Sequence, residues 1–219
     1  TLSGAGVLSG TPTQTGSFPI TVRATGGNGC FGNGTSYTLV ISCQTIVVTN
    51  PVVTTGTAGV AFSQTFTQTG AVAGATFTIN SGTLPTGLTL SGAGVLSGTP
   101  TQTGSFPITV RATGGNTGTP CFGNGTTYTL VISCQTITVT NPVVATGTAG
   151  VFFSQNFTQT GAVAGATFTI NSGTLPSGIT LNTAGLLSGT TTQTGSFPIT
   201  VRATGGNTGT PCFGNGTTY

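Results

Sequence analysis

Apolar and polar residues alternate with a period of two in several short stretches of this chain. The clearest stretch is 106–112, where apolar side chains occupy the even positions and Arg111 is one of the odd ones. Such alternation is typical of a β-strand with one buried face, so Arg111 is predicted to lie on the solvent side. The same pattern predicts strands at 75–79 and 128–132.

Weaker patterns predict the remaining strands of one repeat. Residues 45–49 are β-branched, and Asn50-Pro51 interrupts them before 52–53, which predicts a kinked edge strand. A turn at 56–59 then leads into a strand at 60–68, with Phe62 and Phe66 pointing inward. Short strands are expected at the positions that flank the glycine-rich turn 91–94, namely 88–90 and 95–96. Seven short strands predict an all-β, two-sheet sandwich.

The chain is a tandem repeat. Most of the segment 83–115 also appears within 1–27 and 174–206, and a period of about ninety residues fits one small β domain per repeat. The predicted units are the C-terminal part of a repeat at 1–44, a complete repeat at 45–135 and a repeat without its last strand at 136–219. We expect the missing strands to come from continuing chain or from neighbouring subunits.

Charge is almost absent. The chain has no Asp, Glu or His, and its net charge of +3 comes from Arg23, Arg111 and Arg202, one in each repeat. With 35% hydrophobic residues and no apolar run of membrane-spanning length, the chain is predicted to be a soluble β protein that does not insert into a membrane. Clusters of Lys and Arg are missing, so nucleic acid is not an expected partner.

The residues needed for general acid and base catalysis are also missing. Only Cys and Tyr remain as ionisable candidates, and no base is present to activate them. Glycine-rich stretches such as 92–94 are followed by no Lys and no predicted helix, so they are interpreted as hairpin turns instead of phosphate loops. We therefore predict neither enzymatic activity nor a cofactor.

The five cysteines carry the sharpest information. Cys30 and Cys43 have the same spacing as Cys121 and Cys134, which suggests one local bridge in each repeat. However, a turn at 122–125 followed by one strand over 126–133 would place Cys134 about 25–30 Å from that turn. A disulfide allows only about 7 Å between Cα atoms.

In a sandwich of this topology, the loop before the last strand lies at the N-terminal pole and the last strand ends at the C-terminal pole. This geometry favours bridges between consecutive domains, Cys43 to Cys121 and Cys134 to Cys212, with Cys30 continuing the series. Local pairing and cross-links between separate chains remain alternatives. Free or metal-binding thiols are less expected, because two cysteines without His make a poor zinc site.

Two further motifs have simple interpretations. Sequons at 33–35, 124–126, 156–158 and 215–217 are interpreted as turn chemistry or chance instead of glycosylation sites. Arg111 and its equivalents have no acidic partner in the chain. Each is expected to bond backbone carbonyls or to stack on an aromatic ring of a neighbouring domain or chain.

The segments LPTGLTL at 84–90, GVLSGTP at 94–100 and GSFPITV at 104–110 resemble the signature of immunoglobulin-like repeats in large bacterial secreted and cell-surface proteins. This resemblance implies an immunoglobulin-like or cadherin-like sandwich, an extracellular location and a role in stalks, adhesins or fibres. Such repeats often have Asp where this chain has Gly114. Calcium-stiffened junctions are therefore not expected, since Ca²⁺ prefers carboxylate oxygens.

Two functions fit these features. The first is a structural filament or stalk, stabilised by disulfides and assembled by self-association of neighbouring repeats or chains, because the edge strands lack the charges that discourage pairing. The second is an adhesin that binds glycans, including surface glycans, or other surfaces. The near-identity of the repeats and the absence of Trp favour the first.

Overall fold

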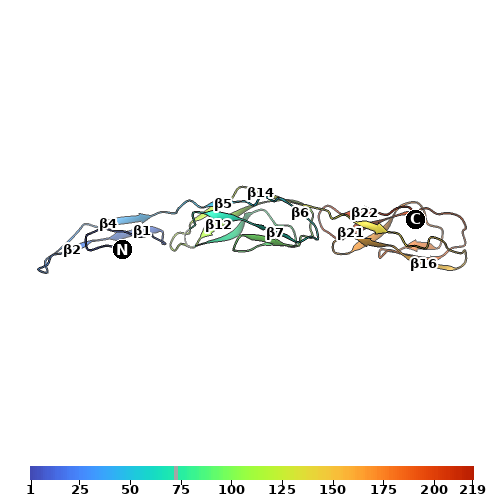
Figure 1. The fold of residues 1–219 in the computed structure, drawn as a ribbon, viewed down its shortest axis with the longest axis horizontal. Helices are drawn as coiled ribbons and strands as arrows, with labels where there is room; N and C mark the ends of the chain where they lie inside the picture. Colours follow the sequence, from blue (N-terminus) through green and yellow to red (C-terminus); the bar gives the residue numbers. More distant parts are fainter. Residues whose placement is uncertain (72–73) are drawn as a thin grey trace.

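The computed structural model describes residues 1–71 and 74–219, which form an elongated rod of three bodies in a row (Figure 1). Its described elements are strands and turns, with no helix among them. The prediction of an all-β chain of tandem immunoglobulin-like domains is confirmed. The two termini lie in the first and last bodies, so the chain runs once along the rod.

The middle body is a two-layer sandwich. One layer contains the pair β5–β8 and the set β7–β11–β10. Its strands are β5 (Val47–Thr49), β7 (Phe62–Thr65), β8 (Thr67–Thr69), β10 (Leu88–Leu90) and β11 (Val95–Gly98). Segments β7 and β8 follow each other around Phe66, whose N–H donates a hydrogen bond to Gly94.

The second layer is built around the long strand β12. Strand β9 pairs along one edge of β12, while β13 and β14 pair in succession along the other edge, and β6 adds to β14 in parallel. The bounds are β6 (Thr55–Thr57), β9 (Ala75–Ser81), β12 (Gly104–Gly114), β13 (Phe122–Asn124) and β14 (Tyr128–Ser133).

The core of the middle body lies between the two layers. Phe66 from one layer meets Tyr128 from the other with ring centroids 5.3 Å apart in an edge-to-face arrangement. Leu130 and Val110 are fully buried beside them. Each such side chain contributes about 1.5–3 kcal/mol through its burial, so the packing between layers holds the sandwich together.

The third body repeats most of this architecture around a core of its own, without described counterparts of β6 and β14. Its pairings are β15–β17, β16–β20–β19 and β18–β21–β22, and Phe157 takes the place of Phe66 against Tyr219. The bounds are β15 (Thr138–Thr140), β16 (Phe152–Asn156), β17 (Thr158–Thr160), β18 (Ala166–Ser172), β19 (Ile179–Leu181), β20 (Leu186–Thr190), β21 (Thr200–Gly205) and β22 (Phe213–Asn215).

The first body is the smallest. Strand β1 pairs with β4, and β2 pairs with β3. The bounds are β1 (Gly16–Ile20), β2 (Arg23–Thr25), β3 (Phe31–Asn33) and β4 (Tyr37–Ile41). Leu2 and Leu8 are about half exposed, at 48% and 47%, so this body has no closed core.

Two predicted elements were placed wrongly. The strand expected at 52–53 is β6, which begins three residues later and overlaps the turn predicted at 56–59, because β14 provides a parallel partner there. The turn expected at 122–125 begins with strand β13, which pairs with β12. At its centre the backbone of Ile46 approaches so closely that a Cβ on Gly123 would lie 1.9 Å from the Ile46 carbonyl oxygen.

Other predictions held. Phe62 and Phe66 are buried, and so are Ile108, Val110 and Ala112 on the inward face of β12. Arg111 lies outside the core, as its odd position predicted. The period of two identified the buried face correctly because one face of each of these strands packs against the opposite layer.

Candidate functional site at the domain junctions

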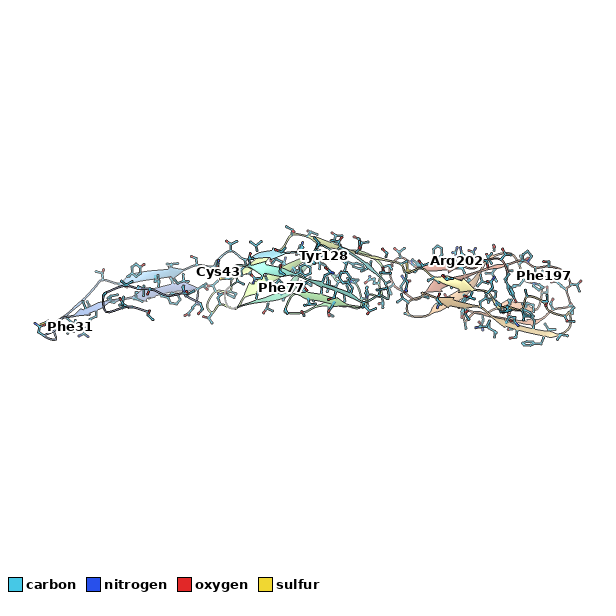
Figure 2. All side chains as sticks on the ribbon, viewed as in Figure 1. Phe31, Cys43, Phe77, Tyr128, Phe197 and Arg202 are labelled. Atoms are coloured by element: carbon cyan, nitrogen blue, oxygen red, sulfur yellow. A yellow bond between two sulfur atoms is a disulfide. The ribbon has the colours of Figure 1, made fainter. Side chains whose placement is uncertain are left out.

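A cystine lies at each junction between consecutive bodies. Cys43 is bonded to Cys121, and Cys134 is bonded to Cys212, with Cα atoms 5.4 Å apart in both cases. Figure 2 labels Cys43 in the narrow segment between the first and second bodies. Cys30, in contrast, is exposed and carries a free thiol. Local bridges within a repeat do not occur in this structure.

The fold places each pair of cysteines at opposite ends of neighbouring domains. Cys43 and Cys134 follow the last strand of their body, while Cys121 and Cys212 precede the short strands β13 and β22 of the next body. Cys121 and Cys212 are 7% and 4% exposed and belong to the cores of their domains. Each cystine therefore ties the end of one sheet to the core of the following sandwich.

A threonine joins the first and second bodies next to the cystine. The Thr15 N–H donates to the Thr117 carbonyl over 2.9 Å, and the Thr15 hydroxyl donates to the Thr119 carbonyl over 2.6 Å. In return, the Thr117 N–H donates to the Thr13 carbonyl over 3.1 Å. Thr15 is only 9% exposed, so its hydroxyl is satisfied by the neighbouring domain instead of by water.

The second junction repeats this arrangement, which we call the threonine clip. Thr103 donates from its N–H to the Thr208 carbonyl over 3.0 Å and from its hydroxyl to the Thr210 carbonyl over 2.7 Å. The Thr208 N–H donates to the Thr101 carbonyl over 3.1 Å. Thr103 is 4% exposed. The recurrence of the same contacts at both junctions indicates one defined mode of docking.

An asparagine links the threonine clip to the cystine. The Asn116 amide nitrogen donates to the Thr119 carbonyl at 2.8 Å and to the Thr15 hydroxyl at 3.3 Å, while its oxygen accepts the Cys121 N–H at 3.2 Å. Asn207 makes the equivalent contacts around Cys212. One side chain thus fixes both the shape of the loop and the position of its cysteine.

The docking loop depends on a glycine. Gly118 has a φ of 86°, which L side chains rarely adopt, and a Cβ there would lie 2.2 Å from the Thr15 carbonyl oxygen. This glycine belongs to the segment 117–121, which is three residues longer than its counterpart Gly29-Cys30 in the first repeat. The loop that docks onto a preceding domain is therefore the longer form.

An apolar contact completes the second junction. Val163 of the third body packs against the core of the middle body, and a Cβ on Gly59 would lie only 2.7 Å from the Val163 Cγ2 atom. The cystine, the threonine clip and the Val163 contact join the third body to the middle body at separate points. Several separated contacts resist both bending and rotation of one domain on the next.

Sequence reasoning singled out the cysteines but missed Thr15, Thr103, Asn116 and Val163. Threonine is so frequent in this chain that two buried threonines give no signal of their own. The three-residue insertion directly before Cys121 was the available signal. A longer loop beside a cross-link can extend far enough to contact the neighbouring domain.

The arginines make their side-chain contacts within their own domains. The Arg111 guanidinium carbon sits 4.3 Å from the centre of the Phe122 ring, and its Nε donates to the Asn124 side-chain oxygen over 2.9 Å. An aromatic partner was expected from a neighbouring domain or chain, and this part of the prediction is wrong. Because β13 pairs with β12, the ring comes from the same domain.

Among residues 1–71 and 74–219, no three His, Cys, Asp or Glu side chains come together as a group that could hold a metal ion. Within the same ranges, no helix is long and apolar enough to cross a membrane. Burial raises the pKa of Tyr128 and of Tyr219 above the ordinary value for tyrosine.

The model of the family described as "Putative Ig domain" matches residues 44–133 and 135–214. A search of curated proteins returned no match. Immunoglobulin-like domains are typically non-enzymatic.

Solved structures similar to this chain include several cadherin-type proteins. The extracellular domain of protocadherin gammaB4 is 16% identical with a TM-score of 0.35, and the match covers 92% of this chain and 39% of that one. Drosophila N-cadherin EC1-4 is 10% identical with a TM-score of 0.33, covering 91% and 58%. An endo-fucoidan hydrolase of glycoside hydrolase family 107 is 18% identical with a TM-score of 0.31, covering 93% and 34%. The match thus covers less than two thirds of each of these three structures.

Proposed function

This chain belongs to the family described as "Putative Ig domain", and we propose that it forms a stiff structural segment of an extracellular filament or stalk. Tandem immunoglobulin-like domains joined by two disulfides fit an extracellular repeat region of the structural or adhesion type. Disulfides persist mainly in oxidising compartments, which supports the extracellular location.

The observation that carries the proposal is the repeated junction. Each cystine joins residues 78 positions apart, and the chain-entropy model gives roughly 4–5 kcal/mol for closing such a loop. Because the bridge connects two domains, it also fixes their relative tilt, which an ordinary linker would leave free to vary. The threonine clip adds hydrogen bonds beside the bridge at both junctions.

This design needs no metal ion for stiffness. Calcium is held in proteins by six to eight oxygen ligands, usually with several carboxylates. The chain contains no Asp or Glu at all. We therefore assign the rigidity of the rod to covalent and hydrogen-bonded contacts between domains.

The proposal includes the units 1–44, 45–135 and 136–219 as successive parts of a longer array, and self-association of neighbouring chains as the route to a fibre. The exposed surface supports lateral association because it carries little charge and repeats an exposed valine. Val52 is 96% exposed, and its counterpart Val143 is 100% exposed. Contacts of this kind would recur once in each repeat along the rod.

The stiffness is tested by removing one bridge. A Cys134→Ser, Cys212→Ser double variant should keep folded domains but show a wider range of interdomain angles by small-angle X-ray scattering. Cys30→Ser is the matched control, because Cys30 is outside both bridges. An unchanged rod in the double variant, or an equal change in the control, would contradict the proposal.

Assembly is tested separately by negative-stain imaging of the native material. A uniform, laterally packed fibre is the expected result. Single beaded stalks that end in a different domain would instead indicate the adhesin function, with the repeats as spacers.

A further inference from the structure

Each repeat places its only charged side chain in the same surface arrangement. An arginine lies over an exposed phenylalanine ring, and an asparagine lies beside it on the same strand as that phenylalanine. We call this arrangement the Arg–Phe–Asn triplet. Its three examples are Arg23, Phe31 and Asn33; Arg111, Phe122 and Asn124; and Arg202, Phe213 and Asn215.

The pairing of two strands brings the triplet together. In the middle domain, Arg111 pairs directly with Asn124, and Phe122 lies two residues along the same strand, so all three share the outer face of the sheet. Phe122 is 54% exposed, and its counterparts Phe31 and Phe213 are 58% and 55% exposed. Figure 2 shows Phe31 and Arg202 at the surface of the first and third bodies.

A hydrogen bond to the asparagine orients Arg111 and Arg202 but occupies only one of their N–H donors. Its Nε donates to the asparagine oxygen over 2.9 Å in the middle domain and 3.0 Å in the third. A guanidinium has five N–H donors, and in the part of the chain that the structure describes the terminal N–H groups of Arg111 and Arg202 make no hydrogen bond. These groups are held at the surface by the ring beneath them, with their donors free.

We propose that the Arg–Phe–Asn triplets bind the acidic groups of an extracellular polysaccharide. The free edge of the guanidinium suits two oxygens of a carboxylate or a sulfate in a bidentate contact. The exposed part of the phenylalanine offers an apolar surface to the C–H groups of a sugar ring, and the asparagine amide nitrogen adds a donor for a hydroxyl group.

Charge complementarity supports this kind of partner. The chain contains no carboxylate side chain, so no internal acid competes for the arginines. The ligand must therefore bring the negative charge. A polysaccharide with an acidic group on many of its sugars can supply one to each triplet without deforming the rod.

Repetition makes weak sites effective. A single exposed ion pair binds weakly, but a chain that presents three similar sites to one polymer gains from the high effective concentration after the first contact. The contacts are also screened by salt. Affinity should therefore rise with the number of intact triplets and fall at high ionic strength. This inference does not rest on the structural function proposed above, because each triplet forms between two strands of a single domain.

The test uses the 219-residue chain in affinity electrophoresis through gels that contain alginate, dextran sulfate or neutral dextran. Retardation is expected with at least one acidic polymer and not with neutral dextran. Alginate and dextran sulfate separate a carboxylate-binding site from a sulfate-binding site. No retardation by either acidic polymer would overturn the proposal.

Two sets of variants then separate the site from simple charge attraction. The triple variant Arg23→Gln, Arg111→Gln, Arg202→Gln should lose at least tenfold in apparent affinity, and Arg111→Gln alone should lose less. The triple variant Phe31→Leu, Phe122→Leu, Phe213→Leu keeps the net charge of +3 and should still lose at least threefold.

Unchanged binding by the phenylalanine variant, with its far-UV spectrum intact, would contradict a sugar-binding site. A single-stranded oligonucleotide serves as the competing polyanion. If it is retained as strongly as the acidic polysaccharides, the triplets are general anion contacts and the proposal is wrong.

Discussion

The middle and third domains contain the same pentapeptide, GSFPI, in two different states. At 104–108 it belongs to strand β12 and pairs with β14, whereas at 195–199 it lies before β21 and forms no strand. A third copy, β1 in the first body, is again a strand because it pairs with β4. Identical local propensity gives different structure, so the pairing partner decides whether this segment becomes a strand.

The side of the core that β14 covers in the middle domain also differs between the two domains. In the middle domain, Leu130 and Ile132 of β14 are 0% and 2% exposed and close the space between the layers. In the third domain, that side opens into a cavity of about 590 Å³ lined by Phe153, Leu187, Ile199 and Tyr219, among others. In the middle domain, β14 is thus the strand that covers this side of the core and pairs with the GSFPI segment.

The largest expected effect comes from extending the 219-residue chain by the residues that form β14 in the middle domain. Appending the residues TLVIS after Tyr219, as they follow Tyr128 in the middle domain, would bury one leucine and one isoleucine. Burial of two such side chains should stabilise the domain by about 3–6 kcal/mol. Hydrogen exchange should show new protection at 195–199. An appended TSVSS serves as the control, and equal protection by both tails would refute the explanation.

Weakening the strand in the middle domain should have a slightly smaller effect. Leu130→Ala removes a fully buried side chain and should lower the free energy of unfolding by about 2–5 kcal/mol. Val131→Ala is the control on the same strand, because Val131 is 39% exposed, and should change stability by less than about 0.5 kcal/mol. Denaturant unfolding measures both. Equal losses would mean that the inward and outward positions are reversed.

A smaller effect is expected from the tyrosine at the start of that strand. The Tyr128 hydroxyl donates to the Val53 carbonyl, and Tyr219 donates to Val144 in the same way. Tyr128→Phe should cost about 1 kcal/mol, and Tyr219→Phe less, because Tyr219 is less buried and water can replace the lost donor. Thermal unfolding of the two variants provides the comparison. A greater loss at Tyr219 would go against it.

The smallest effect concerns pH. Because the chain has no Asp, Glu or His side chain, its stability should be nearly flat from about pH 3 to pH 9. Burial raises the pKa of Tyr128 and Tyr219 in the folded state. The stability they contribute is therefore complete below the unfolded value of about 10 and is lost as pH rises through the folded value. Urea unfolding as a function of pH, with thiols blocked, checks this profile, and a loss of stability in acid would disagree with it.

Much of the fold could be read from alternation alone. Strands β9, β12 and β14 have one buried face, and their period of two gave both their positions and the outward direction of Arg111. Strand β6 was misplaced because its sequence, Thr-Gly-Thr, has weak strand propensity. It becomes a strand only because β14 lies beside it, and pairing of this kind does not show in a local pattern.

The junctions were predictable only in part. Strand length limits which cysteines can meet, and that argument uses geometry that any β-strand shares. The threonine clip depends instead on contacts between residues about one hundred positions apart, such as Thr15 with Thr119. Neither threonine differs in sequence from its many exposed neighbours, so only the three-dimensional structure could identify them.

The central claim, that a cystine joins each domain to the next, can be tested by one digestion. Trypsin can cleave this chain only after Arg23, Arg111 and Arg202. After the free thiol is blocked with a maleimide at near-neutral pH, digestion in denaturant without reductant should leave fragments 24–111, 112–202 and 203–219 covalently linked, and reduction should separate them. Fragments 24–111 and 112–202 that separate without reductant would mean local bridges, Cys30 to Cys43 and Cys121 to Cys134, and would contradict the account.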